Sequence, residues 1–360
     1  TFDSLLARTD TMKYFHLYCM GRDYAQMKPS LSNTISDSLL IHSEKDNYLR
    51  GIISAYNLRG IIFTYEDNYV NAVTNLKEAI KIGKTNKESS ELIRDKYGCT
   101  LYYLGDLYFK KNDYKVAIDY YRRSLDIFES FSDYELQQED LNFLLTSIAF
   151  TTIREDKAYA MYSVGRTYLK LDEIDSSKKY LANSLHLAKE TKYDRLEAMV
   201  YFSLSELHLS VQDTASAKKY LEKSIHLSLF NNLNEYIIYG YLMKMEIDLA
   251  QKNYKQMEFI YKKLLSLTTI MNMRSEKAKT HQLYSEYLYA IGNSIDAYVE
   301  LDSANQIRLK LADDDKSREF GQLEAGIKYQ QSLYDLELKS IKAKEEEKRL
   351  TSQLYYSLAV

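Results

Sequence analysis

The chain has 360 residues and contains 35 Tyr, 11 Gly and a single Pro. Its hydrophobic content of 45% excludes extensive disorder, and its net charge of −3 gives no basic excess that would favour nucleic-acid binding through this region. Because Pro and Gly interrupt helices, their scarcity favours an all-α fold.

Residues 1–52 have helical spacing but an irregular pattern. Phe2, Leu5 and Leu6 recur near helical spacing, and Gly21 and Pro29 interrupt the segment. The pattern does not match the segments that follow it. We therefore predict a degenerate helical cap at the N-terminus of a longer helical array.

The stretch 98–131 carries the most informative spacing in the chain. Leu104-Gly105 is followed by Tyr108, and the sequence then places Ala117, Tyr121 and Ser124 at intervals of nine, four and three residues. This pattern resembles the tetratricopeptide repeat, a helix–turn–helix unit of 34 residues, although a serine occupies its last small position. The resemblance implies an all-α, right-handed α-solenoid in which the first helix of each repeat lines a concave groove.

The same spacing recurs along residues 53–312 and predicts an array of about six repeats. The residues at the small position are Gly60, Gly105, Gly165, Ser205, Met245 and Ser285, and the last four are 40 residues apart. A fixed period is the signature of stacked repeats. The interval between Gly105 and Gly165 is longer, so we expect an elongated helix pair or an inserted short helix near residues 132–157.

Residues 313–360 predict a long, charged C-terminal helix with a weak heptad pattern, which also favours self-association. Its last residues, Leu350–Val360, are more apolar and include Tyr355 and Tyr356. Two interpretations fit this end. It is either a packed helix terminus or the edge of a membrane segment that begins just after Val360.

No motif for catalysis, cofactor binding or metal binding is present in the sequence, so an enzyme is not predicted. Cys19 and Cys99 lie 80 residues apart and cannot form a zinc site alone. We expect both to be free thiols in the core. A binding function is therefore the stronger prediction.

The family resemblance implies that the fifth and ninth positions of each repeat face the groove. The residues at these positions that we select as candidates are Asn57, Tyr102, Asp106, Tyr162, Arg166, Phe202, Glu206, Glu246 and Glu286. Aromatic residues beside charges are typical of protein or peptide binding sites, and an acidic row favours a basic partner segment. The same aromatics would also suit packing between neighbouring repeats.

The order of segments is similar to the sensor region of membrane-anchored bacterial regulators and sensor kinases that carry such repeats. This similarity implies a sensing domain on the periplasmic face of an inner membrane. A soluble adaptor or assembly scaffold and a cytoplasmic peptide-pheromone receptor remain alternatives. No module that would produce an output is visible in the sequence.

Overall fold

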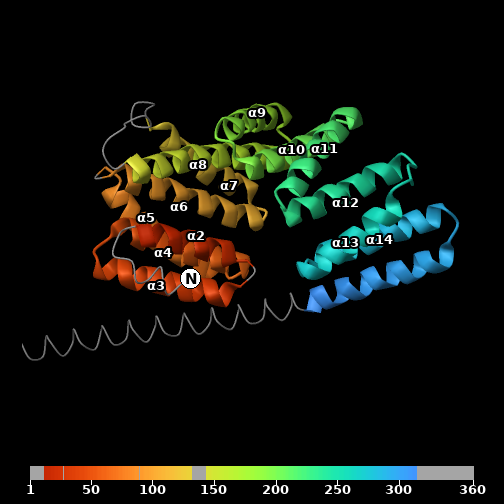
Figure 1. Cartoon of the computed structure of the whole chain (residues 1–360), viewed down its shortest axis with the longest axis horizontal. Helices are drawn as coiled ribbons and strands as arrows, with labels where there is room; N and C mark the ends of the chain where they lie inside the picture. Colours follow the sequence, from red (N-terminus) through yellow and green to blue (C-terminus); the bar gives the residue numbers. More distant parts are fainter. Residues whose placement is uncertain (1–11, 27, 89, 132–142, 314–360) are drawn as a thin grey trace, which may run out of the picture. The chain divides into compact units, whose positions relative to one another are not determined.

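The computed structural model describes residues 12–26, 28–88, 90–131 and 143–313, and every regular element in these ranges is a helix (Figure 1). The predictions for residues 1–11 and 314–360, including the charged C-terminal helix, lie outside them. The chain divides into two compact units, Thr1–Lys255 and Gln256–Val360. The all-α solenoid predicted from the sequence is confirmed.

Unit 1 consists of helices that follow one another in pairs. They are α2 (Met12–Tyr24), α3 (Pro29–Lys45), α4 (Leu49–Tyr65), α5 (Tyr69–Asn86), α6 (Glu91–Lys110), α7 (Tyr114–Glu129), α8 (Phe143–Lys170), α9 (Ile174–Glu190), α10 (Asp194–Ser210), α11 (Thr214–Phe230) and α12 (Asn234–Ala250). Helix α8 has 28 residues and extends into the segment 132–157, for which we expected an elongated pair or an inserted helix.

Short turns between the helices have a common geometry. Asp67, Asn112 and Gln212 each adopt a left-handed conformation, with φ of 58°, 59° and 62°. In the turn at Asn112, the backbone N–H of Asp113 donates to the carbonyl of Tyr108, which satisfies a carbonyl at the end of α6. The Asp113 side chain then accepts a hydrogen bond from the N–H of Val116 and caps α7. A left-handed residue, Asn112, followed by a helix-capping aspartate, Asp113, thus reverses the direction of the chain within a short turn.

Small residues allow the two helices of a repeat to pack closely. A Cβ atom added at Gly105 would lie 2.5 Å from the ring of Tyr121, so only glycine fits at this crossing. The small position near the end of the repeat has a different role. Ser124 donates a hydrogen bond of 2.8 Å to the carbonyl of Gly98, and Ser184 and Ser224 bond in the same way to Ala158 and Ala198. Serine in the last small position therefore bridges the two helices.

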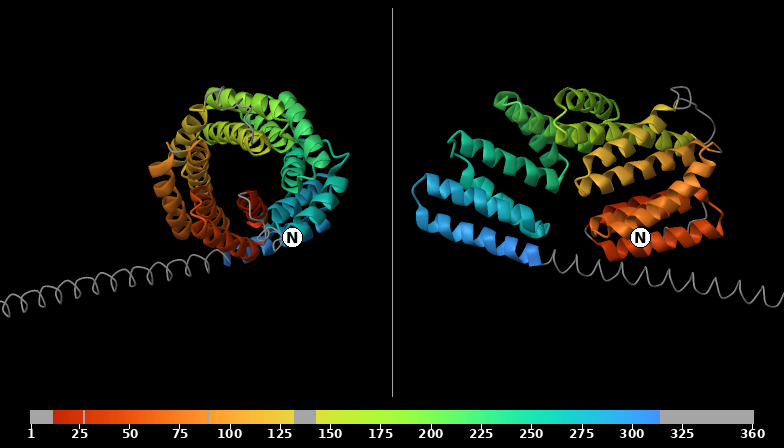
Figure 2. Two further views of the ribbon diagram at one scale, coloured as in Figure 1. Left: turned by 60° about the vertical axis from the view of Figure 1, so that its left-hand side comes forward. Right: turned by 180° about the vertical axis from the view of Figure 1, so that it is seen from behind.

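The first helices of successive pairs lie on the inner side of the curve of unit 1, and the second helices lie on its outer side (Figure 2). Consistent with this arrangement, α4 contacts α6, α6 contacts α8, and α10 contacts both α8 and α12. Side chains of these first helices therefore form the inner face of unit 1.

Unit 2 contains α13 (Met257–Ile270), α14 (Arg274–Ala290) and a helix over residues 294–313. Ser285 of α14 donates a hydrogen bond of 2.7 Å to the carbonyl of Ala297, which repeats the contact between Ser205 and Ala217 in unit 1. Among the helices of the described ranges, none combines the length and the apolar character needed to cross a membrane.

Candidate functional site

The inner face of unit 1 is built from one stripe of residues on each first helix. Residues spaced by four, three and four positions share one face of a helix. The stripes are Asp95, Cys99, Tyr102 and Asp106 on α6; Glu155, Tyr159, Tyr162 and Arg166 on α8; Arg195, Met199, Phe202 and Glu206 on α10; and Glu235, Tyr239, Leu242 and Glu246 on α12. The face thus combines tyrosines with charges of both signs.

Five tyrosines from four segments form a continuous row on this face, which we call the tyrosine row. The hydroxyl oxygens of Tyr18 and Tyr103 are 2.5 Å apart and hydrogen-bonded. Ring centroids are then 5.5 Å apart between Tyr103 and Tyr102, 6.1 Å between Tyr102 and Tyr159, and 5.8 Å between Tyr159 and Tyr193. The row joins α2, α6, α8 and the turn before α10, and its rings meet edge-to-face or tilted, with interplanar angles of 79° between Tyr103 and Tyr102, 83° between Tyr102 and Tyr159 and 54° between Tyr159 and Tyr193.

The phenols of the tyrosine row remain protonated at neutral pH. Burial raises the pKa of Tyr102 and of Tyr103 well above the ordinary value of 10.0, and burial also raises the pKa of Tyr159 and Tyr193. Each phenol is therefore able to donate a hydrogen bond. The row offers both aromatic surface and hydroxyl groups.

A hydrogen bond between Tyr121 and Asp106 links the inner face to the packing of α6 against α7. The hydroxyl of Tyr121 on α7 donates a hydrogen bond of 2.6 Å to the carboxylate of Asp106 on α6. Burial raises the pKa of Asp106 to about 6, against the opposing effects of this hydrogen bond and the charge of Arg166. The Arg166 guanidinium lies 4.0 Å from the ring centroid of Phe109.

A buried cluster of ionisable groups lies beside the tyrosine row. The ligand atoms of Asp95, Cys99 and Asp156 lie within 4.8 Å of one another, which is a spacing that a metal ion could use. However, the Lys96 ammonium lies 2.9 Å from Asp95 and 3.8 Å from the Cys99 sulfur, and it supplies the positive charge of the cluster. Burial raises the pKa of Cys99 well above 9.0, and its thiol donates to Asp156 over 3.3 Å.

Two of the groove residues proposed from the sequence are buried. Asn57 has no exposed surface, and its amide nitrogen lies 3.5 Å from the Lys96 carbonyl oxygen. Tyr162 is 3% exposed. Asn57 therefore contributes to the packing between helices, and Tyr162 is a buried member of the α8 stripe.

The acidic residues predicted to form one row have different environments. Glu206 lies 3.7 Å from the Lys170 ammonium. Glu246 is exposed on α12, whereas Glu286 belongs to unit 2 and accepts a hydrogen bond from Gln282. Phe202 contacts the rings of Tyr236 and Tyr239. The structure brings together Tyr102, Asp106 and Arg166 from the predicted set.

Several inner-face residues were not among the sequence candidates. They are Tyr18, Arg22, Tyr103, Tyr159, Tyr193 and Arg195. The sequence contained two patterns that could have identified three of them. Tyr18 and Arg22 flank Gly21 as Tyr102 and Asp106 flank Gly105, and Tyr159 lies one helical turn before Tyr162.

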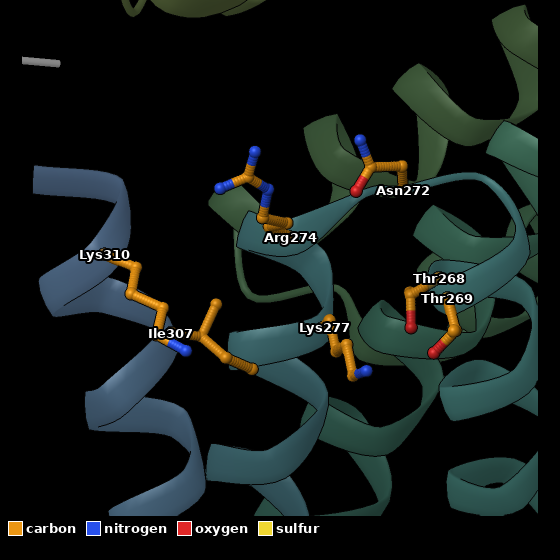
Figure 3. A pocket seen from close by; sticks show the side chains of 7 residues that line it. All are labelled: Thr268, Thr269, Asn272, Arg274, Lys277, Ile307 and Lys310. Atoms are coloured by element: carbon orange, nitrogen blue, oxygen red, sulfur yellow. The ribbon is translucent and has the colours of Figure 1, made fainter. Parts of the chain in front are cut away.

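Unit 2 has a separate basic cavity of about 270 Å³ (Figure 3). Its lining residues are Thr268, Thr269, Asn272, Arg274, Lys277, Ile307 and Lys310. They come from the end of α13, the turn that follows it, the start of α14 and the helix over 294–313, and none of them is acidic. None of the sequence candidates lies in this cavity.

Comparisons with known proteins agree with this architecture. Residues 51–130 match the family model of the tetratricopeptide repeat. The apo form of RapI has a TM-score of 0.56 at 14% identity, over 84% of this chain and 99% of RapI. The Rap conjugation gene regulator of plasmid pLS20, in complex with the Phr* peptide, has a TM-score of 0.53 at 14% identity, over 83% and 96%.

A third solved structure has the same fold. Aspartyl phosphate phosphatase F from Bacillus subtilis has a TM-score of 0.52 at 12% identity, over 85% of this chain and 86% of that protein. A search of curated protein sequences found no match. The repeat spacing and the helix pairs agree with the tetratricopeptide repeat family, whose model matches residues 51–130 of this chain.

Proposed function

We propose that this chain is a non-catalytic domain that binds a protein or peptide segment on the inner face of unit 1. The observation that carries the proposal is the tyrosine row. Its five tyrosines come from four segments, and each contacts the next through its ring or its hydroxyl group. Tyrosine is enriched at binding hot spots because it combines a large apolar surface with a hydrogen-bonding group. A peptide laid across the row would contact rings and hydroxyls from several repeats.

The similarity to the Rap conjugation gene regulator supports this proposal. That regulator is described in complex with a peptide, and it has the same fold as this chain. At 14% identity the likeness concerns the fold, so the residues that would contact a ligand here must come from this chain's own inner face. Tyr102 and Tyr159 lie at the middle of the tyrosine row and are the first candidates.

A synthetic library of immobilised octapeptides would test the proposal. We expect a subset of peptides to bind, and we expect Tyr159→Ala to weaken their binding at least about tenfold, as for a hot-spot tyrosine. The matched control is Tyr180→Ala, because Tyr180 lies on the outer helix α9 and its ring stacks on Tyr168 with centroids 5.7 Å apart. Absence of any bound peptide, or equal effects of both variants, would contradict the proposal.

We also propose that the domain is the sensing portion of a bacterial signalling or transcription-regulatory protein. The apolar residues before Val360 and the repeat array upstream support this role over that of a soluble adaptor or a cytoplasmic peptide-pheromone receptor. Sequencing the gene past the codon for Val360 tests it. About twenty apolar residues followed by Lys or Arg would support a membrane-anchored sensor, and a stop codon would reject that model.

A further inference from the structure

The basic cavity belongs to unit 2, whereas the tyrosine row belongs to unit 1. Arg274 and Lys277 line the cavity from the start of α14, and Lys310 lines it from the helix over residues 294–313 (Figure 3). None of the lining residues is acidic. Three positively charged side chains from two helices therefore surround a volume of about 270 Å³ whose walls carry no negative charge.

Two of these three charges are not neutralised by the part of the chain that the structure describes. Neither Lys277 nor Lys310 forms an ion pair with a described carboxylate. Lys262 on α13 differs from them, because its ammonium lies 2.6 Å from the Glu258 carboxylate. Lys277 and Lys310 therefore keep charge that a ligand in the cavity could neutralise.

Two acidic residues are close to these lysines in the sequence but do not line the cavity. Glu276 directly precedes Lys277, and successive residues of an α-helix with 3.6 residues per turn project about 100° apart. Asp313 follows Lys310 by three residues and is exposed. These carboxylates reduce the charge around the cavity, but they leave its walls positive.

The uncharged polar residues of the cavity differ in what they offer a ligand. The hydroxyls of Thr268 and Thr269 each donate a hydrogen bond of 2.7 Å to a backbone carbonyl, of Leu264 and Leu265 respectively. The side-chain amide of Asn272 forms no hydrogen bond within the described ranges, and it has two N–H donors. Donors for a ligand therefore come from one amide and three cationic side chains, a set that suits an anion.

We propose that this cavity binds a small organic phosphate. A phosphate monoester carries a charge of about −1.5 to −2 at pH 7 and three strong acceptor oxygens, which match the excess of donors. Arginine binds phosphate through two parallel hydrogen bonds, and lysine binds it as a point charge. Ile307 supplies apolar surface for the organic part of the ligand. The volume lies just below the usual range of about 300–1,000 Å³ for ligand pockets, which favours a small ester.

Isothermal titration calorimetry with the whole chain tests this proposal. The probes are phenyl phosphate, inorganic phosphate and benzoate, in Tris chloride at pH 7.5 and low ionic strength. We expect phenyl phosphate to bind with a Kd of about 0.1 mM or below. Benzoate has the same ring but a single charge, so it should bind at least about tenfold more weakly. Inorganic phosphate should bind about threefold more weakly, because it has no ring to cover Ile307.

Variants of the lining residues test the two parts of the site. Lys277→Ala and Lys310→Ala should each weaken the binding of phenyl phosphate about tenfold, since each removes one charge from the phosphate group. Ile307→Ala should remove the advantage of phenyl phosphate over inorganic phosphate and leave the affinity for inorganic phosphate unchanged. The matched control is Lys262→Ala, which removes a paired lysine of the same unit and should change the affinity by less than about twofold. Circular dichroism of each variant would show that it is folded.

Three results would overturn the inference. They are binding of phenyl phosphate only above about 10 mM, equal affinity for phenyl phosphate and benzoate, and equal effects of Lys277→Ala and Lys262→Ala. Equal binding of phenyl phosphate and inorganic phosphate would overturn the organic part of the proposed ligand. All of these measurements concern unit 2 and small anions, so their failure is distinguishable from failure of the peptide-binding function proposed for unit 1.

Discussion

The Tyr121 hydroxyl and the Asp106 carboxylate are hydrogen-bonded across 2.6 Å, from the second helix to the first helix of one repeat. The same tyrosine ring lies against Gly105, which is the residue before Asp106. A residue that fills the space between two helices therefore also contacts an ionisable group of the inner face. Changes in helix packing and changes in the charge of the inner face are linked at this point.

The first prediction concerns the hydrogen bond itself. Tyr121→Phe keeps the ring but removes the donor to Asp106, and hydrogen bonds to charged groups contribute about 1.5–3 kcal/mol. We expect the variant to lose about 2 kcal/mol of unfolding free energy at pH 7.5, as measured by urea denaturation. Tyr120→Phe is the control, since its ring stacks on Tyr108 and it should change stability by less than about 0.5 kcal/mol. Equal stability of the two variants would contradict the role of this bond.

The second prediction concerns the pH dependence of stability. Burial raises the pKa of Asp106 to about 6, from the ordinary value of 3.8. Between these pH values the folded state holds the proton that the unfolded state has lost, so this group lowers stability as the pH rises from about 4 to about 6. Asp106→Asn removes this titration. The melting temperature of the variant relative to the natural chain should therefore be higher at pH 7.5 than at pH 4.

If the relative melting temperature of Asp106→Asn were instead lower at pH 7.5 than at pH 4, the carboxylate of Asp106 would be stabilised by the fold when it is charged. Melting curves of both proteins at pH 4, 5, 6 and 7.5 distinguish the two cases. The difference between the two proteins isolates Asp106, because Asp156 also has a pKa raised to about 6 by burial and is present in both.

The repeat register could be predicted from the sequence because close helix crossings leave a strict spacing of small residues. Gly105 and Tyr121 were identified in this way, and the structure shows why they belong together. The sequence alone did not explain Ser124. Its hydroxyl bonds to the Gly98 carbonyl, and Ser184 and Ser224 recur at the same repeat position, but a small residue there does not reveal which backbone carbonyl its hydroxyl meets.

The contacts of the inner face were harder to predict. Tyr18 and Tyr103 are 85 residues apart in the sequence, and their contact depends on how α2 lies against α6. Position within a repeat identifies which side of a helix a residue occupies, but not which partner it meets. Asn57 illustrates this limit, because it has the expected repeat position and yet is buried beside the Lys96 carbonyl.

The third prediction tests the packing at Gly105. A Cβ atom there would lie 2.5 Å from two ring atoms of Tyr121, and an aromatic ring cannot yield as a flexible side chain can. Gly105→Ala should therefore destabilise the chain by about 1–3 kcal/mol, the usual range for overpacking. Urea denaturation gives the measurement.

A control for Gly105→Ala exists at the equivalent position of another repeat. Ser205→Ala adds no atom, and it removes one hydrogen bond of 2.9 Å to the Ala217 carbonyl, so it should cost about 1 kcal/mol. If Gly105→Ala is as stable as the natural chain, the two helices do not cross as closely as the structure indicates.

The last prediction concerns the buried ion pair beside the tyrosine row. The Lys96 ammonium lies 2.9 Å from Asp95, and both side chains are almost fully buried. Lys96→Met would leave a buried carboxylate without its counter-charge, and such losses cost about 3–5 kcal/mol. We expect a decrease of this size in the unfolding free energy, measured by urea denaturation at pH 7.5.

The double variant Asp95→Asn with Lys96→Met separates the charge from the volume of these side chains. Removing both charges leaves no unpaired carboxylate at residue 95, so the double variant should be more stable than Lys96→Met alone. If the double variant is the less stable of the two, Lys96 acts mainly on Cys99 and Asp156 rather than on Asp95. The Lys96 ammonium lies 3.8 Å from the Cys99 sulfur, and its charge opposes the effect of burial on the pKa of Asp156, so this comparison identifies the partner that requires the positive charge.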